Sequence, residues 1–99
     1  MSNQTVLTPG DDDYENDLKE LAEYIADAIK GEDIDYDDDR KGYPFDIEDL
    51  EYCPSSSPSD QSLIETELKE AIEKYYAEEF DEYINATVVI DGEQIIVDI

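Results

Sequence analysis

The sequence predicts an α+β fold, with two amphipathic helices packed on a small antiparallel sheet that contains a C-terminal β-hairpin. Three observations lead to this prediction. Apolar residues recur at three- and four-residue spacing over two long segments, at about 12–30 and 60–83. The segment 86–98 instead has two β-branched runs on either side of a turn signal, and every second residue falls on one nearly all-apolar face. Because 99 residues suffice for one modest core, we expect a single domain over 1–99.

The N-terminal third is predicted to be a short lead-in followed by the first helix. Residues 1–10 are polar apart from Val6 and Leu7, and we expect a flexible lead-in or, alternatively, a short edge strand. The helix is expected over 12–30, because aspartates at its start suit the free N–H groups and the positive end of the helix dipole. Gly31 is expected to end it in a left-handed cap. The predicted inward stripe comprises Tyr14, Leu18, Leu21, Ile25, Ala28 and Ile29.

The segment 31–53 is strongly acidic and has the least regular pattern. Ile34 and Tyr36 alternate with aspartates, which favours a short extended segment with one buried side. Residues 41–44 (KGYP) have the composition of a turn. Residues 46–52 fit either two helical turns or a short strand, and we favour the helix.

A loop and a second helix are predicted next. Residues 54–59 are rich in Ser and Pro, which is typical of a loop, and the helix is expected over 60–83. Ser62 and Glu65 have the spacing of a capping box, and Ser59 or Asp60 is an alternative cap. The predicted inward stripe comprises Ile64, Leu68, Ala71, Ile72 and Tyr75, and then drifts to Tyr76, Phe80 and Tyr83. Two stabilising pairs are predicted at four-residue spacing, Glu65–Lys69 and Glu70–Lys74.

The C-terminal segment predicts a β-hairpin over 86–98. Asp91-Gly92 is a favoured pair for a two-residue turn, and we place Ile90 opposite Glu93. An isolated hairpin is barely stable in water, so its apolar face must be covered by the helices. That face comprises Ile84, Ala86, Val88, Ile90, Ile95, Val97 and Ile99.

The composition argues against an enzyme, and we predict no catalytic residue, no cofactor and no specific metal site. The chain has no His to act as a base near neutral pH. An EF-hand loop that starts at Asp33 or Asp35 has Asp38 or Arg40 where the turn requires Gly. The single cysteine, Cys53, excludes an intrachain disulfide and a thiolate zinc site.

The net charge is the dominant feature of the sequence. Thirty Asp and Glu against six Lys and Arg give −24, whereas a net charge of about 2–8 is ample for the solubility of a small domain. Such a composition is often a mark of disorder, but the apolar periodicity and eight tyrosines favour folding. Because the excess charge costs stability through repulsion, we expect a function that uses it.

Acidic residues on a helix can present charges at phosphate-like separations. Residues three or four apart lie about 4.5–6 Å apart along the helix axis, and each DNA strand places one phosphate per ~3.4 Å. Tyrosine is enriched at protein interfaces, so two tyrosines of the acidic segment are included in the predicted binding surface. The predicted partner-binding residues are Asp33, Asp35, Asp37, Asp38, Asp39, Glu20, Glu23, Asp27, Glu67, Glu70, Glu73, Tyr36 and Tyr43.

In size, charge and aromatic content the whole chain resembles the DNA-mimic inhibitors of phages and mobile elements. That group includes anti-CRISPR proteins, antirestriction proteins and uracil-DNA-glycosylase inhibitors. The resemblance implies a stoichiometric inhibitor that occupies the cationic DNA- or RNA-binding groove of a bacterial defence complex. The expected partner is of the Cas effector or restriction enzyme type, with anti-CRISPR slightly favoured, and the protein itself would bind no nucleic acid.

Other functions remain open on the sequence. The main alternative is an acidic adaptor, antitoxin or chaperone-like partner of a basic protein; an accessory domain or a divalent-ion buffer is a third interpretation. No apolar run approaches 18 residues and the N-terminus has no signal-peptide pattern, so we expect a cytoplasmic protein without membrane contact. For a phage-encoded chain this would be the host bacterial cytoplasm. The oligomeric state is open, a dimer included.

Overall fold

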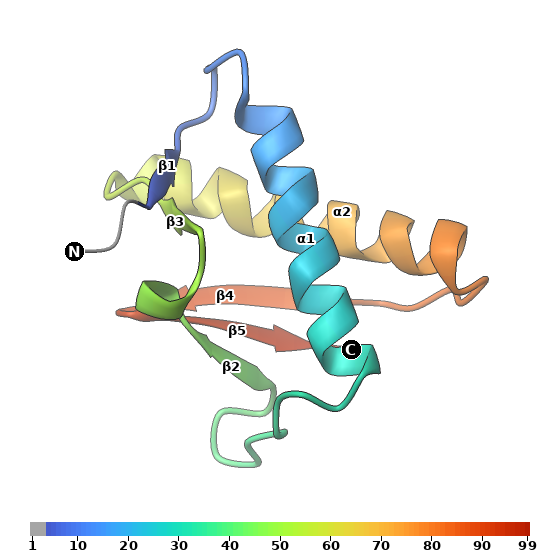
Figure 1. Ribbon diagram of the computed structural model, residues 1–99. Coiled ribbons are helices and arrows are strands. Elements are labelled where there is room, and N and C mark those ends of the chain that lie inside the picture. The colour runs from blue at the N-terminus through green and yellow to red at the C-terminus, as the bar shows by residue number, and fades with distance from the viewer. Residues whose placement is uncertain (1–3) are drawn as a thin grey trace.

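In the computed structural model, which describes residues 4–99, two helices cover one side of a three-stranded antiparallel sheet (Figure 1). A separate two-stranded parallel sheet links the segment before the first helix to the segment before the second. The α+β prediction, with two helices on a small sheet that contains a C-terminal hairpin, is confirmed. The elements are β1 (Thr5–Leu7), α1 (Tyr14–Lys30), β2 (Tyr43–Asp46), a 3₁₀ turn (Ile47–Asp49), β3 (Tyr52–Pro54), α2 (Pro58–Glu79), β4 (Thr87–Asp91) and β5 (Gln94–Asp98).

The N-terminal segment is held by a strand and does not form a flexible lead-in over residues 4–10. Strand β1 pairs in parallel with β3, with Val6 opposite Cys53. Leu7 is fully buried in the core, and its carbonyl accepts a hydrogen bond from the Ser55 N–H at 3.1 Å. Burial of this one leucine therefore fixes the segment, which agrees with the alternative prediction of a short edge strand. Residues 1–3 of the predicted lead-in lie outside the described residues.

Helix α1 begins two residues later than expected and ends at Lys30 as expected, but its left-handed cap lies one residue beyond the predicted Gly31. Asp13 precedes it without a side-chain capping bond. Gly31 has a φ of −83°, so it is not left-handed; Glu32 adopts the left-handed conformation, with a φ of 59°. The Asp33 N–H bonds the Ala28 carbonyl at 2.9 Å, and the Glu32 N–H bonds the Ile29 carbonyl at 3.2 Å. This is a Schellman arrangement shifted by one residue along the chain.

Helix α2 is displaced toward the N-terminus relative to the prediction, over Pro58–Glu79 in place of 60–83. Pro58 occupies the first turn, where its missing N–H costs nothing. The capping box is therefore wrong, and the Glu65 carboxylate accepts a hydrogen bond from the Ile90 N–H of β4 at 2.7 Å. Because the helix ends at Glu79, Tyr83 is 87% exposed and does not extend the inward stripe.

The acidic segment contributes two strands and a 3₁₀ turn that its sequence pattern did not indicate. Residues Tyr43 and Pro44, predicted as part of a turn, begin strand β2, and Phe45 is buried against the helices. Residues 46–52 form neither two helical turns nor one strand, since the 3₁₀ turn is followed by β3. Pro44 is tolerated in β2 because this strand forms one edge of the sheet.

The hairpin has the predicted faces but a different register. Ile90 pairs with Ile95, not with Glu93, and the two residues between the strands are Gly92 and Glu93. Gly92 has a φ of +60°, which glycine adopts without strain. A shift of two residues preserves the alternation of side chains, so the predicted face still packs on the helices. Its buried members are Ala86, Val88, Ile95 and Val97.

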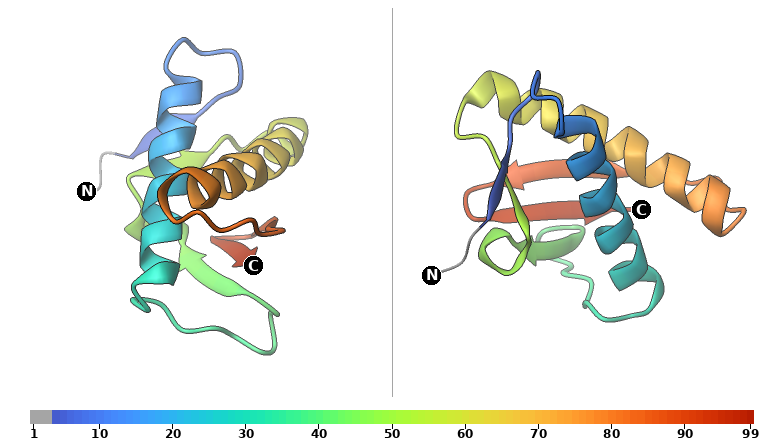
Figure 2. Two further views of the ribbon diagram at one scale, coloured as in Figure 1. Left: turned by 90° about the vertical axis from the view of Figure 1, so that its right-hand side faces the viewer. Right: turned by 45° about the horizontal axis from the view of Figure 1, so that its top comes forward.

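The core lies between the two helices and the covered face of the sheet (Figures 1 and 2). The predicted stripes of both helices supply most of it, because apolar residues at three- and four-residue spacing share one side of a helix. Its fully or nearly fully buried helix residues include Leu18, Leu21, Ile25, Ile64, Leu68 and Ile72. No helix among residues 4–99 combines the length and apolar character needed to cross a bilayer.

We expect added salt to stabilise this fold. The structure pairs few of the 30 carboxylates, since residues 4–99 form four ion pairs. Screening relieves repulsion among the rest, so the thermal midpoint should rise by several degrees between about 20 mM and about 500 mM NaCl. Circular dichroism at the two salt concentrations measures this, and a midpoint that stays level or falls would contradict it.

Candidate functional site

The acidic loop, defined as residues 31–42, connects α1 to β2 and lies at the end of α1 away from its N-terminus (Figures 1 and 2). The loop closes on itself, because Asp37 and Gly42 exchange backbone hydrogen bonds of 2.9 and 3.2 Å. Lys41 makes the reversal with a φ of 57°. Residues 37–42 of the loop therefore form a small turn closed by backbone hydrogen bonds.

Gly42 joins this loop to the sheet by a close approach. An added Cβ at this position would lie 2.7 Å from Cγ2 of Ile96 and 3.0 Å from the Val97 carbonyl oxygen. Ile96 points to the face of the sheet opposite the helices and is nevertheless only 8% exposed. The loop thus packs against β5 at Gly42, and only glycine allows that contact because any Cβ would collide with Ile96 and Val97.

Asp37 is the one predicted aspartate of the loop that is engaged within it. One of its carboxylate oxygens accepts the N–H groups of Asp39 and Arg40 at 2.9 and 3.2 Å, and the other accepts the Arg40 guanidinium at 2.6 Å. These bonds, chiefly the one from the guanidinium, lower the pKa of Asp37. Asp37 therefore shapes the turn, and its charge is matched by Arg40.

The other four predicted aspartates of the loop present their charge to solvent. They are exposed, and none of the four ion pairs among residues 4–99 includes them. These residues are Asp33, Asp35, Asp38 and Asp39. The loop accordingly presents four aspartates outside the ion pairs of the described residues, although Arg40 and Lys41 lie in the same loop.

The two predicted tyrosines meet at this loop. The rings of Tyr36 and Tyr43 pack edge to face, with centroids 5.3 Å apart and an interplanar angle of 81°. Tyr43 is half-buried on β2, whereas Tyr36 is 45% exposed. The structure thus places one fixed and accessible aromatic ring among the aspartates.

The three acids predicted on α1 follow one another along the helix, and tyrosines from neighbouring elements reach two of them. The Tyr52 hydroxyl of β3 donates to Glu20. The Tyr75 hydroxyl of α2 donates to Asp27 at 3.0 Å. Glu23 lies between them in sequence and is half-buried. These carboxylates are held in place without being neutralised, because a tyrosine hydroxyl donates a hydrogen bond and carries no charge.

The three acids predicted on α2 do not form one row. Glu67 accepts the Tyr14 hydroxyl of α1 at 2.7 Å, whereas Glu73 accepts the Ala86 N–H beside β4 at 2.9 Å. Residues six apart point about 120° apart on a helix, which accounts for the separation. Glu70, the middle residue, is exposed and lines a groove between the helices.

Lysines offset part of the acidic charge on α2. The predicted pairs Glu65–Lys69 and Glu70–Lys74 are wrong: Lys69 pairs with Glu73 at 2.7 Å, and Lys74 with Glu78 at 3.9 Å. Glu65 is instead engaged with β4, so its lysine partner turns toward the following helical turn. Lys19 and Lys74 also line the groove that contains Glu67 and Glu70. The surface of α2 is therefore less strongly anionic than the acidic loop.

Hydrogen bonds from tyrosine to carboxylate recur between elements, and the sequence pattern did not reveal them. Burial, and then the bond to Glu67, raises the pKa of Tyr14. The bonds to Glu20 and to Asp27 raise the pKa of Tyr52 and of Tyr75, each to about 12. The partners are 53, 32 and 48 residues apart in sequence, so no local spacing could indicate them.

We expect these tyrosines to make the fold sensitive to alkaline pH. Their pKa in the folded state is raised above the unfolded value of about 10, so their contribution is complete below pH 10 and lost as the pH rises toward 12. The free energy of unfolding should therefore fall above pH 10, and Tyr14→Phe should make that fall shallower. Urea unfolding at pH 8 and pH 11 measures the difference, and equal losses in the variant and the unmodified protein would contradict it.

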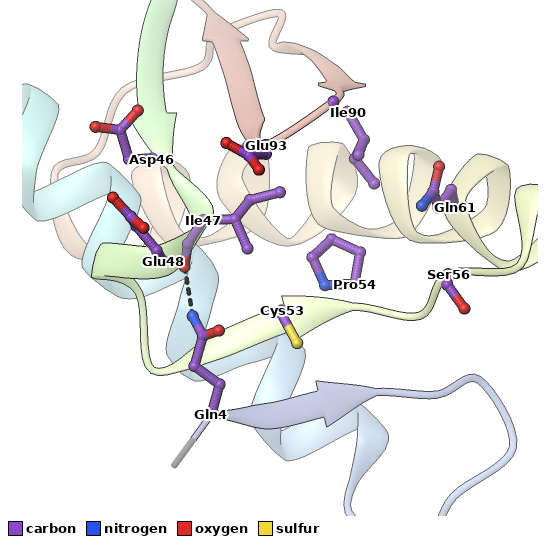
Figure 3. Close-up of a pocket in the computed structure, with 11 residues that line it drawn as sticks. Gln4, Asp46, Ile47, Glu48, Cys53, Pro54, Ser56, Gln61, Ile90 and Glu93 are labelled. Carbon is purple, nitrogen blue, oxygen red and sulfur yellow. Dashed lines mark hydrogen bonds between the residues drawn. The ribbon is translucent and has the colours of Figure 1, made fainter. Parts of the chain in front are cut away.

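A separate hollow, of about 390 Å³, lies between β3 and the hairpin turn, away from the acidic loop (Figure 3). The Gln4 amide fixes one wall by donating to the carbonyls of Ile47 and Leu50, the latter at 2.8 Å. Cys53 lines the hollow together with Glu48 and other residues, but no basic side chain does so. Residues 4–99 also contain no group of three or more His, Cys, Asp or Glu arranged to hold a metal ion.

Comparisons of the chain with protein-family models, curated protein sequences and solved structures found no match.

Proposed function

We propose that this protein is an acidic inhibitor that imitates nucleic acid and occupies the cationic DNA- or RNA-binding groove of a bacterial defence complex. The partner would be a Cas effector or a restriction enzyme. One observation carries the proposal: an ordered loop presents several uncompensated aspartates around an exposed tyrosine, on a domain with a net charge of −24. A cationic groove attracts such a surface over long range and pairs with it at contact.

The fixed position of the carboxylates supports mimicry over simple polyanionic attraction. Glu20, Asp27 and Glu67 are each held by a tyrosine from another element. A preorganised array of carboxylates loses less conformational entropy on binding than a flexible acidic tail does. The phosphates of a duplex are preorganised in the same sense. The molecule measures 30 × 29 × 25 Å, which matches roughly nine base pairs of duplex at ~3.4 Å per step.

The test is an affinity capture from bacterial lysate with the protein immobilised. At one low salt concentration, bound proteins are eluted either with short duplex DNA or with polyglutamate of equal total charge. Mimicry predicts that DNA releases a nucleic-acid-binding complex and that polyglutamate releases much less, since only DNA fits the groove. Equal release by both would contradict mimicry and indicate ion exchange. Capture of a basic protein that DNA does not displace would favour an acidic adaptor.

A further inference from the structure

Tyr36 is the exposed aromatic ring at the centre of the acidic loop. Its edge-to-face contact with Tyr43, at 5.3 Å between centroids, holds the ring in a defined orientation. The backbone beside it is fixed by the pair of hydrogen bonds between Asp37 and Gly42. With 45% of its surface exposed, the ring therefore presents a preformed flat surface to a partner.

Two hollows adjoin Tyr36, and it contributes to the lining of both. The first is acidic and is otherwise lined by Asp35, Asp37, Asp38, Asp39 and Pro44. The second is lined by aromatic and aliphatic residues, among them Tyr43, Tyr76, Ile84 and Ile99, and by the charged residues Lys30, Glu32 and Glu82. A ligand that contacts Tyr36 thus meets aromatic surface and carboxylates together.

Asp38 lines the acidic hollow beside Tyr36, and Asp98 follows Val97, the β5 residue that pairs with Tyr43. Partial burial, and then the negative charges of Asp98 and Asp38, raise the pKa of Tyr36. Asp98 ends β5 and Asp38 lies within the acidic loop, so the two charges come from different elements. Their combined field attracts a cation to this position.

The fold already binds one cation in this way nearby. The Lys30 ammonium, which lines the second hollow, lies 5.2 Å from the centroid of the Phe80 ring and 2.6 Å from a Glu82 oxygen. Among residues 4–99 this is the one cation placed over an aromatic ring, so no internal cation covers Tyr36. Tyr36 therefore also combines an aromatic ring with nearby carboxylates, but no lysine or arginine of the described residues lies over its ring.

From this geometry we infer that Tyr36 and the carboxylates around it form a receptor for an arginine side chain of the basic partner. The inference rests on the proposed function, since it is the cationic groove that supplies the arginine. Arginine is specified over lysine because its planar guanidinium stacks on an aromatic face while its N–H groups bond carboxylates, whereas an ammonium is a compact charge. The loop thereby carries a stacking position as well as negative charge.

The test uses octa-arginine and octa-lysine as probes for the isotopically labelled protein, followed by NMR. Octa-arginine should shift the amide signals of Tyr36, Tyr43 and Asp98 most, and octa-lysine should shift them less at equal concentration. Tyr36→Ala should weaken octa-arginine binding by about 3-fold to 5-fold, and Tyr36→Phe should retain it. The matched control is Tyr83→Ala, which also removes an exposed tyrosine without changing the net charge and should have no effect.

Two results would overturn the inference. The first is uniform shifts over all acidic segments of the unmodified protein, a measurement that needs no variant to fold. The second is unchanged octa-arginine affinity in a folded Tyr36→Ala protein. The lysate capture separates this inference from the proposed function. If Tyr36→Ala captures the nucleic-acid-binding complex as strongly as the unmodified protein and DNA still displaces it, the proposed inhibitor stands and the arginine site is wrong. If octa-arginine binds at Tyr36 but the lysate yields no nucleic-acid-binding complex, the arginine site stands and the proposed inhibitor is wrong.

Discussion

Conversion of Asp35, Asp38 and Asp39 to lysine should weaken binding of the captured partner by about 100-fold or more. Each of these carboxylates is exposed and outside the ion pairs of the fold, so reversal replaces an attraction to the cationic groove by a repulsion. Three such contacts at roughly 1 kcal/mol each correspond to about two orders of magnitude in Kd. Biolayer interferometry with the purified partner measures the change.

The matched control converts Asp11, Asp12 and Asp13 to lysine. This variant changes the net charge by the same amount, and its three residues are also exposed. They lie at the opposite end of α1, whose 17 residues span about 25 Å, well beyond the screening length of ~10 Å at 0.1 M salt. We expect less than about a 10-fold loss. Equal losses in both variants would show that binding depends on net charge alone and not on the acidic loop.

Leu68→Ala should strongly destabilise the fold. Leu68 is fully buried between the helices and the sheet, and truncation of a buried leucine removes apolar contact and leaves a cavity. The expected loss is about 2–5 kcal/mol in the free energy of unfolding. For a domain of this size that lowers the thermal midpoint by about 10 °C or more.

Leu63→Ala makes the same chemical change on the same helix and serves as the control. Leu63 is 45% exposed, so its truncation should cost less than about 1 kcal/mol. Urea unfolding of both variants at one high salt concentration separates the core effect from charge repulsion. Similar losses for the two leucines would contradict the packing described for α2.

The regular elements were largely predictable because their signals are local. Helix stripes follow from the 3.6-residue period, so Leu18, Leu21 and Ile25 were correctly placed in the core. The covered face of the hairpin was correct even with the wrong register, since a shift by two residues leaves the alternation unchanged. The predicted helix caps were less accurate, because neighbouring residues were equally plausible as caps. The Schellman turn uses Glu32 and not Gly31, and α2 begins earlier, at Pro58.

Short strands were not predictable because their partners are distant in sequence. Strands β1 and β3 have three residues each, too few for a periodic pattern, and they pair across 47 residues, as Thr5 with Tyr52. Strand β2 resembles a turn in composition, and it became a strand because β5 offered an edge on which Phe45 could be buried.

For the candidate site, the sequence by itself determined the sign and density of the charge, since composition does not depend on folding. It also indicated the acidic loop, whose aspartates lie close together in the chain. Only the tertiary structure decided which acids remain uncompensated. It engaged Asp37 and Glu73 in internal bonds and set Tyr36 against Tyr43 as an exposed ring. Hydrogen bonds and ring contacts act over a few ångströms, so they depend on which distant segments the core brings together.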